Sequence, residues 1–143
     1  DFANLVKYAD GYQPGACRFD MGERAQFHLM PMARAALTQL LDWGVDAIAA
    51  TLAARTRAMA ARAAGMGFMS DPETRRAGHF LGLTREAPLP AGLPGILSGD
   101  RVHVSVRGPA IRVTPHLWTT DDDVDRFFEA LGHATGTGAG TGA

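Results

Sequence analysis

Cysteine is almost absent from this chain of 143 residues, in which Cys17 is the single example. An internal disulfide and a cysteine-based zinc site are therefore excluded, and one unpaired thiol fits a reducing, cytoplasmic setting. Long apolar runs and a signal peptide are also lacking, which argues against a membrane-spanning or secreted protein. The formal net charge of −1 offers no electrostatic attraction for nucleic acid or an anionic membrane.

Lysine is nearly absent as well, because 13 of the 14 basic residues are arginine and Lys7 is the single lysine. The apolar fraction is 46%, yet 25 residues are alanine, which buries little surface. A core built from so much alanine is thin, which favours a missing partner surface. The chain opens on Asp1 without an initiator methionine, so we expect a piece of a longer protein.

Two helices are predicted in the first half of the chain. The first covers 27–44, with Pro31 in its first turn and Gly44 at its end. The second covers 45–64 and is followed by glycines. Each has an apolar stripe at helical spacing. The stripe of the first comprises Leu29, Ala33, Ala36, Leu37, Leu40 and Leu41, and that of the second comprises Val45, Ile48, Leu52, Met59 and Ala63.

The clearest β pattern lies over 101–107, where valine recurs at every second position. A Gly-Pro dipeptide then turns the chain into a second strand over 110–114. In that strand Ile111 and Val113 share one face, while Arg112 lies on the other. A β-hairpin is therefore predicted, with Arg112 on its polar face.

Shorter apolar runs bounded by glycine and proline predict strands over 67–71 and 78–84. A loop over 86–98, containing one helical turn, joins them to the hairpin. A last helix begins after Thr120, which forms an acidic variant of the capping box with Asp123. Its apolar stripe comprises Val124, Phe127, Phe128 and Leu131.

The order of helix, helix, strand, strand, hairpin and helix predicts an α+β fold. In this fold a small, mostly antiparallel sheet has helices packed on one face. Residues 1–25 are rich in turn-forming residues and are interpreted as an irregular connecting segment. Residues 26–132 form the α+β domain with its connecting helices, and 133–143 are a low-complexity tail that we expect to be disordered.

Arg112 is the first candidate for a functional side chain. A guanidinium on the polar face of a strand can hold a carboxylate through two parallel hydrogen bonds. The alternative is a solvated arginine or an ion pair with an acidic neighbour. His116, which lies close to Thr114 and Trp118 in the chain, either lines a pocket or is a hydrogen-bonded structural histidine. None of the five histidines has the spacing of metal ligands, so no metal site is predicted.

The segment before the first helix is a second candidate. Asp20 and Glu23 lie in a polar loop there, and helix N-termini attract anions, so a phosphate can approach. A plain capping loop is the alternative. Nothing near Cys17 argues for a lowered pKa of its thiol, so Cys17 is interpreted as inert rather than nucleophilic.

Two stretches together resemble a known family. YQPGACRFDMGERAQFHLMPMARAALTQLLDWGV and VHVSVRGPAIRVTPHLWTTDDDVDRFFEAL are similar to the C-terminal part of class V aminotransferase-fold enzymes, which are pyridoxal-phosphate (PLP) enzymes of fold type I. Members include isopenicillin N epimerase-like proteins, cysteine desulfurases, selenocysteine lyases and kynureninases. The resemblance covers about residues 8–132 and is strongest toward the isopenicillin N epimerase-like group.

The resemblance implies roles for several residues. Arg112 matches the arginine that binds the α-carboxylate of the amino-acid substrate, and His116 follows it in the same matching run. The RFDMGE loop matches a segment that reaches toward the cofactor phosphate of the other subunit in a homodimer. The desulfurases have threonine where this chain has Glu23, and a carboxylate repels a phosphate. The phosphate role therefore falls to the backbone near Gly22 and to the side chain of Gln26.

The chain also departs from the family pattern. PLP enzymes need a lysine for the Schiff base, and Lys7 does not match the Ser-x-His-Lys-like context of that lysine. The resemblance thus places the lysine in a large domain upstream, so this chain alone is expected to be inactive. Desulfurases carry a cysteine between the two late strands, where this chain has only 107–110, reading RGPA. An epimerase, transaminase or lyase is therefore favoured.

Two alternatives remain beside the PLP hypothesis. One is a free-standing α+β binding or interaction module without a cofactor, which predicts that no apolar face is left uncovered. The other is a desulfurase-like enzyme, which predicts sulfur carried on Cys17. The PLP hypothesis predicts an exposed apolar surface on residues 29–60, where the large domain and a second subunit would pack.

Overall fold

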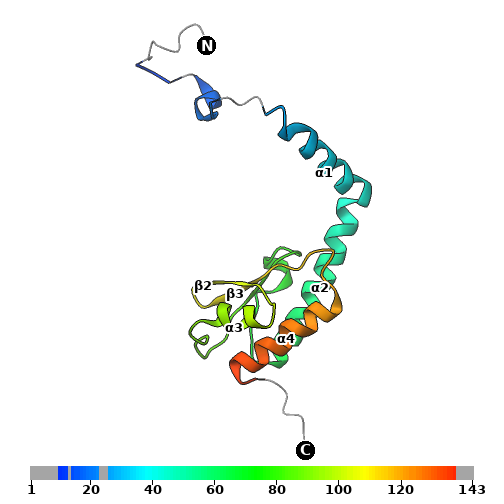
Figure 1. The fold of residues 1–143 in the computed structure, drawn as a ribbon, viewed down its shortest axis with the longest axis vertical. Helices are drawn as coiled ribbons and strands as arrows, with labels where there is room; N and C mark the ends of the chain where they lie inside the picture. Colours follow the sequence, from blue (N-terminus) through cyan, green and yellow to red (C-terminus); the bar gives the residue numbers. More distant parts are fainter. Residues whose placement is uncertain (1–9, 13, 23–25, 138–143) are drawn as a thin grey trace, which may run out of the picture. The chain divides into compact units, whose positions relative to one another are not determined.

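The computed structural model describes residues 10–12, 14–22 and 26–137. The chain divides into two compact units, Asp1–Asp42 and Trp43–Ala143. The first unit contains the short 3-10 helix η2, Gly15–Phe19, and most of helix α1, Leu29–Trp43 (Figure 1). The helix predicted over 27–44 is confirmed.

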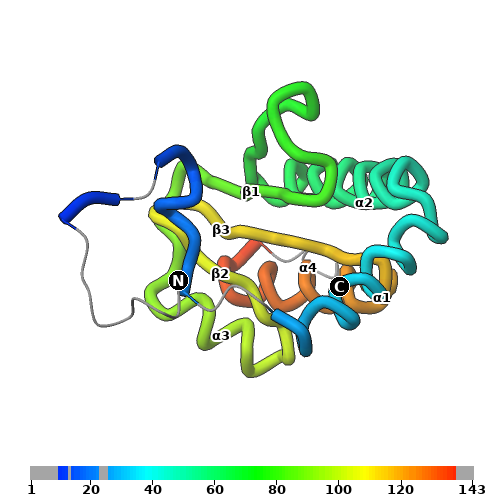
Figure 2. The backbone as a smooth tube through the Cα atoms, turned by 90° about the horizontal axis from the view of Figure 1, so that it is seen from above, coloured from blue at the N-terminus to red at the C-terminus, as the bar shows by residue number. Residues whose placement is uncertain are grey.

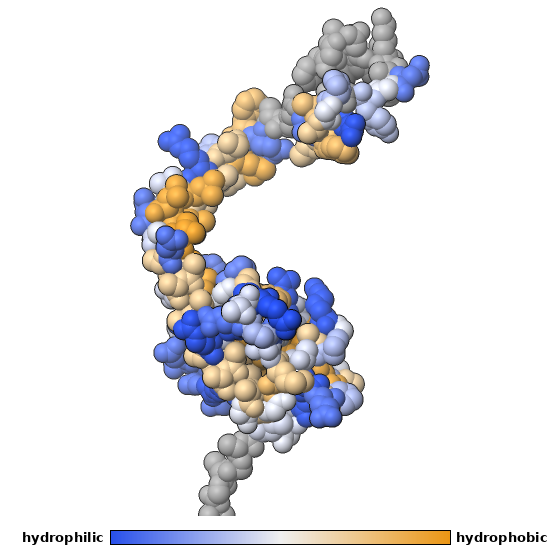
Figure 3. Space-filling model, turned by 180° about the vertical axis from the view of Figure 1, so that it is seen from behind, coloured by the Kyte–Doolittle hydropathy of each residue, from blue (hydrophilic) through white to orange (hydrophobic). Residues whose placement is uncertain are grey.

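Helix α1 ends where Gly44 has a φ of +81°, a conformation that an α-helix cannot continue and that glycine adopts without strain. Within the described part of the chain, none of the α1 residues is buried. Its apolar side chains stand open to solvent, including Leu41 at 72% exposure (Figure 3). The exposed apolar surface predicted over 29–60 is thus found along α1 but not throughout α2, where Leu52 and Met59 are buried.

The second unit is an α+β domain, as predicted. Its elements in chain order are α2 (Val45–Gly65), η3 (Glu73–Arg75), β1 (Leu81–Leu83), α3 (Leu93–Gly99), β2 (Ser105–Arg107), β3 (Ala110–Val113) and α4 (Asp121–Thr135). The three strands form an antiparallel sheet in the order β1-β3-β2. Figure 2 shows β3 between its two neighbours. The last strand in the chain is therefore the central strand of the sheet.

The hairpin β2–β3 is closed by two residues, Gly108 and Pro109. Gly108 has a φ of +55°, which suits the first central position of a tight hairpin turn. The register places Arg112 opposite Ser105 on β2 and opposite Gly82 on β1. The predicted alternation is confirmed in β3, where Ile111 is fully buried and Arg112 is exposed.

One face of the sheet carries the hydrophobic core. Helices α2, α3 and α4 supply the other side of this core, so the prediction of helices on one face is confirmed. Burying each large aliphatic or aromatic side chain stabilises the fold by about 1.5–3 kcal/mol. The largest contributors are Leu81 and Leu83 of β1, Leu93 and Leu97 of α3, Ile111 of β3, and Phe127, Phe128 and Leu131 of α4.

Three strand predictions are wrong in extent. The strand predicted over 78–84 is confined to Leu81–Leu83. The strand predicted over 67–71 is reduced to a single bridge, in which Met69 and Thr84 exchange backbone hydrogen bonds of 2.7 and 2.9 Å. The strand predicted over 101–107 begins only at Ser105. The reason is that the backbone of 101–102 instead closes α3, which has two turns where one was expected: the Val102 N–H donates to the Leu97 carbonyl.

The last helix begins as predicted. Thr120 and Asp123 form a reciprocal capping box: each accepts a hydrogen bond from the backbone N–H of the other. The helix continues to Thr135, into the segment that was assigned to the tail, and residues 138–143 lie outside the described residues. Among the helices described, none combines the length and the apolar character needed to cross a bilayer.

Candidate functional site

Arg112 lies at the centre of the solvent-facing side of the sheet. Its guanidinium carbon is 5.2 Å from the centroid of the Phe80 ring, which supports it from below through a cation–π contact. Arg112 makes no hydrogen bond or ion pair with any residue that the structure describes. The alternative of an ion-paired arginine is therefore not what the structure shows, and the guanidinium is available to an external anion.

The neighbours of Arg112 on this face are small. Gly82 lies directly opposite on β1, and a Cβ atom added there would meet nothing within 4 Å. Ser105 lies opposite on β2 and contributes a hydroxyl group. The open space beside Gly82, here called the strip, adjoins the Arg112 guanidinium, and the Ser105 hydroxyl lies on its other side in the sheet. This arrangement suits a carboxylate, which accepts two parallel hydrogen bonds from arginine.

His116 occupies a turn after β3 and not the surface around Arg112. Its backbone N–H donates to Thr119 Oγ1 at 2.9 Å, and its carbonyl accepts from the Thr119 N–H at 3.0 Å. The imidazole stacks on Trp118 with 3.7 Å between ring centroids. Its Nδ1 atom is buried and lacks a hydrogen-bond partner among the described residues. Between Arg112 and His116 themselves, no hydrogen bond or ring contact is found in the part of the chain described.

Gly22 and Gln26 belong to the first unit, and Arg112 and His116 belong to the second. Gly22 is exposed, with open space around it. The Gln26 carbonyl accepts from the N–H groups of Leu29 and Met30, so this residue lies in the turn that leads into α1. Its side-chain amide lies 4.0 Å from the sulfur of Met21, which leaves it with only a weak acceptor.

Three other residues considered as candidates lie away from Arg112 in the chain or outside the described residues. Cys17 is an exposed free thiol in η2. Lys7 and Glu23 lie outside the described residues. Over the ranges that the structure describes, no three histidine, cysteine, aspartate or glutamate side chains lie close enough together to hold a metal ion.

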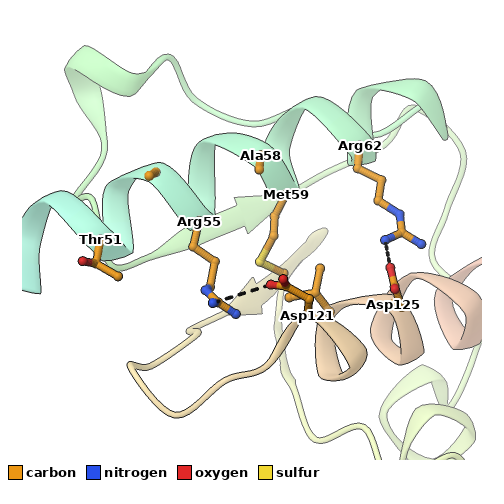
Figure 4. A pocket seen from close by; sticks show the side chains of 9 residues that line it. Thr51, Arg55, Ala58, Met59, Arg62, Asp121 and Asp125 are labelled. Atoms are coloured by element: carbon orange, nitrogen blue, oxygen red, sulfur yellow. Dashed lines mark hydrogen bonds and ion pairs between the residues drawn. The ribbon is translucent and has the colours of Figure 1, made fainter.

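A groove that no sequence pattern predicted lies between α2 and α4. Its volume is about 400 Å³, and Figure 4 shows the side chains that line it. Arg55 reaches across it from α2, donates to the Thr119 carbonyl and lies 3.6 Å from Asp121 Oδ1. Arg62 forms a second ion pair across the groove with Asp125. These contacts join residues more than 60 positions apart in the chain, so no local pattern reveals them.

The contacts in this groove help to hold the segment that follows Arg112 in place. Thr119 is held at three atoms, because its carbonyl accepts from Arg55, its hydroxyl accepts from His116 and its N–H donates to His116. The capping box then fixes Thr120 at the start of α4, and the Thr120 backbone N–H and hydroxyl hold the pKa of Asp123 below its ordinary value. The segment between β3 and α4 is thus held by contacts with α2 and with the start of α4.

The sequence was compared with models of protein families, with curated proteins and with solved structures, and none of the three comparisons gave a significant match.

Proposed function

We propose that this chain contains the C-terminal, substrate-carboxylate-binding domain of a cytoplasmic PLP-dependent enzyme of the class V aminotransferase fold, acting on an amino acid. The observation that carries the proposal is the Arg112 guanidinium. It is unpaired among the described residues, stands on the central strand and is backed by Phe80. In this role Arg112 fixes the α-carboxylate, so that the reacting bond of the amino acid is held in one orientation.

The described residues do not themselves make a PLP site. The cofactor needs a lysine amine, and the single lysine, Lys7, lies outside them. Gly22 offers an exposed backbone, and the Gln26 side-chain amide has only the Met21 sulfur as a partner, so these two residues supply few donors for a phosphate. The cofactor would therefore be held mainly by an upstream large domain, and the role proposed for this chain is limited to substrate binding.

The exposed apolar side chains of the first helix support a partner surface. Leu37, Leu41 and Trp43 are between 50% and 72% exposed. A patch of this kind on a helix favours burial against another domain or subunit. This favours the large domain and a homodimer over the alternative of a free-standing binding module, which predicts that such a face is absent.

The desulfurase alternative is not favoured. The β2–β3 connection, where a persulfide-forming cysteine would be expected, consists of Gly108 and Pro109 only. Cys17 belongs to the other unit of the chain. Treatment of the purified protein with cyanide is therefore expected to release no sulfur.

Arg112→Ala in the full-length enzyme tests the proposal. We expect a steep rise in KM for the amino acid, and Arg112→Lys should also lose affinity because the two-pronged contact is gone. Arg107→Ala on the neighbouring strand is the control, since Arg107 is exposed and its side chain donates only to the adjacent Val106 carbonyl. An unchanged KM in Arg112→Ala would overturn the assignment.

A further inference from the structure

A second pocket lies on the core side of the sheet, between β3, the segment after α3 and the start of α4. Its volume is about 340 Å³, at the lower end of the roughly 300–1,000 Å³ typical of small-molecule sites. Its polar and aromatic lining includes Arg101, His103, Thr114, Trp118, Asp123 and Arg126. Arg112 is not part of this lining, so the pocket is independent of the function proposed above.

Arg101 has an unusual backbone. Its φ is +60°, and it is the one non-glycine residue with a positive φ in the described ranges. It lies just after α3, where its N–H donates to the Ser98 carbonyl, a helix-end position that normally holds glycine. An arginine here strains the backbone, whereas glycine would not. Residues strained in this way cluster at active sites, ligand-binding sites and switch regions.

The two arginines of the pocket differ in their pairing. Arg126 donates to Asp123 Oδ1 at 3.0 Å, so its charge is neutralised within the capping box. The Arg101 side chain forms no hydrogen bond or ion pair with the residues described, although Asp100 and Glu129 border a neighbouring hollow with it. The free cation of the pocket is therefore Arg101, and its fork of N–H donors matches a carboxylate.

The pocket also has a flat aromatic wall. Trp118 is 76% exposed, although one face of its indole is stacked on His116. A large aromatic surface left open to solvent beside a cation can stack against a planar ring. Buried Val102 and Phe127 close the apolar floor of the pocket.

We propose that this pocket binds a small aromatic carboxylate. The Arg101 guanidinium holds the carboxylate, and the ring lies against Trp118 above the apolar floor. The strained backbone at Arg101 is retained because glycine, which would relieve it, cannot supply the cation.

In the test, benzoate is titrated into the full chain carrying Trp43→Phe. Trp118 is then the single tryptophan of the chain, so its fluorescence reports binding. Benzoate should change the emission saturably. Benzyl alcohol, which has the ring without the charge, and inorganic phosphate, which has the charge without the ring, should each bind at least ten-fold more weakly. Arg101→Gly should lose at least ten-fold in benzoate affinity while its Tm rises, since the strain is relieved.

Arg101→Asn serves as a second variant, because asparagine tolerates a positive φ but carries no charge. It should lose binding like Arg101→Gly, whereas the exposed Arg107→Gln should bind benzoate as the parent does. The proposal is overturned if benzoate does not bind, if either Arg101 variant binds it as tightly as the parent, or if benzyl alcohol or phosphate binds equally well. A lowered Tm in Arg101→Gly would also overturn it, because the side chain would then serve the fold.

Discussion

The Arg112 guanidinium carbon lies 5.2 Å from the centroid of the Phe80 ring, on the solvent-facing side of the sheet. The ring limits the directions in which the guanidinium can point, because the cation is attracted to the face of the aromatic group. The free cation is thereby held above the strip beside Gly82, where a carboxylate has room to bind.

Under the function proposed for Arg112, removing the Phe80 ring should weaken substrate binding without abolishing it. We expect Phe80→Leu to raise KM for the amino acid by about two- to five-fold, since an exposed cation–π contact contributes roughly 0.5–1 kcal/mol. The kcat should change less than KM. Arg85→Ala, which breaks the separate contact between Arg85 and Phe68, is the matched control and should leave KM unchanged. Equal effects of the two variants would contradict a positioning role for Phe80.

Filling the strip beside Arg112 should block the carboxylate. Gly82→Val has space for its side chain, and a β-branched residue suits a strand, so the Tm should stay the same or rise. Substrate affinity should fall by about ten-fold or more, because overpacking a contact costs roughly 1–3 kcal/mol. Gly99→Ala, which also enters open space, is the control. A Gly82→Val enzyme with normal KM would show that the substrate approaches elsewhere.

The capping box should contribute measurably to stability. Thr120→Ala removes the hydroxyl that accepts from the Asp123 N–H at 3.1 Å, and the loss of an N-cap side chain costs about 1 kcal/mol. Urea unfolding of this variant should show that difference. Thr74→Ala, at an exposed position in η3, should show none.

The same capping box should make the free energy of unfolding depend on pH in the acid range. The Thr120 backbone N–H, then its hydroxyl and then Arg126 lower the pKa of Asp123 below its ordinary value of 3.8. Because the folded pKa is the lower one, the stabilisation is complete above about pH 4 and is lost as the pH falls through the folded value. The unfolding free energy of the parent should therefore fall relative to that of Asp123→Asn below about pH 4, because asparagine does not titrate. A constant difference down to pH 2 would refute this account.

The contact between α2 and the segment after β3 should matter more than a surface ion pair on the same helix. Arg55→Gln loses the hydrogen bond to the Thr119 carbonyl and the pair with Asp121, at a side chain only 24% exposed. We expect a loss of about 1–2 kcal/mol in unfolding free energy. Arg57→Gln breaks the exposed pair with Glu73 and should cost clearly less. The reverse order in urea unfolding would contradict the role of Arg55.

Local patterns were sufficient for helices α1, α2 and α4 and for the hairpin. The apolar stripes of α2 and α4, the Thr120 cap and the alternation around Arg112 all act within a few residues, and each is present in the structure. The predictions that were wrong concern the lengths of β-strands, of α3, where one helical turn was expected, and of α4, which extends past residue 132. The segment around Met69 keeps only one bridge, and the segment after Arg101 closes a helix, since strand length depends on partners distant in the chain.

The candidate site likewise has one feature that a local pattern predicts and others that only the tertiary structure shows. The sequence by itself determined that Arg112 lies on the polar face of a strand, because side chains alternate with a period of two. Only the tertiary structure decided that β3 is the central strand, that Phe80 and Gly82 adjoin Arg112 and that Arg55 holds Thr119. These features depend on packing between segments about 30 or more residues apart, and pairing at that range depends on the geometry of the whole core and not on any local pattern.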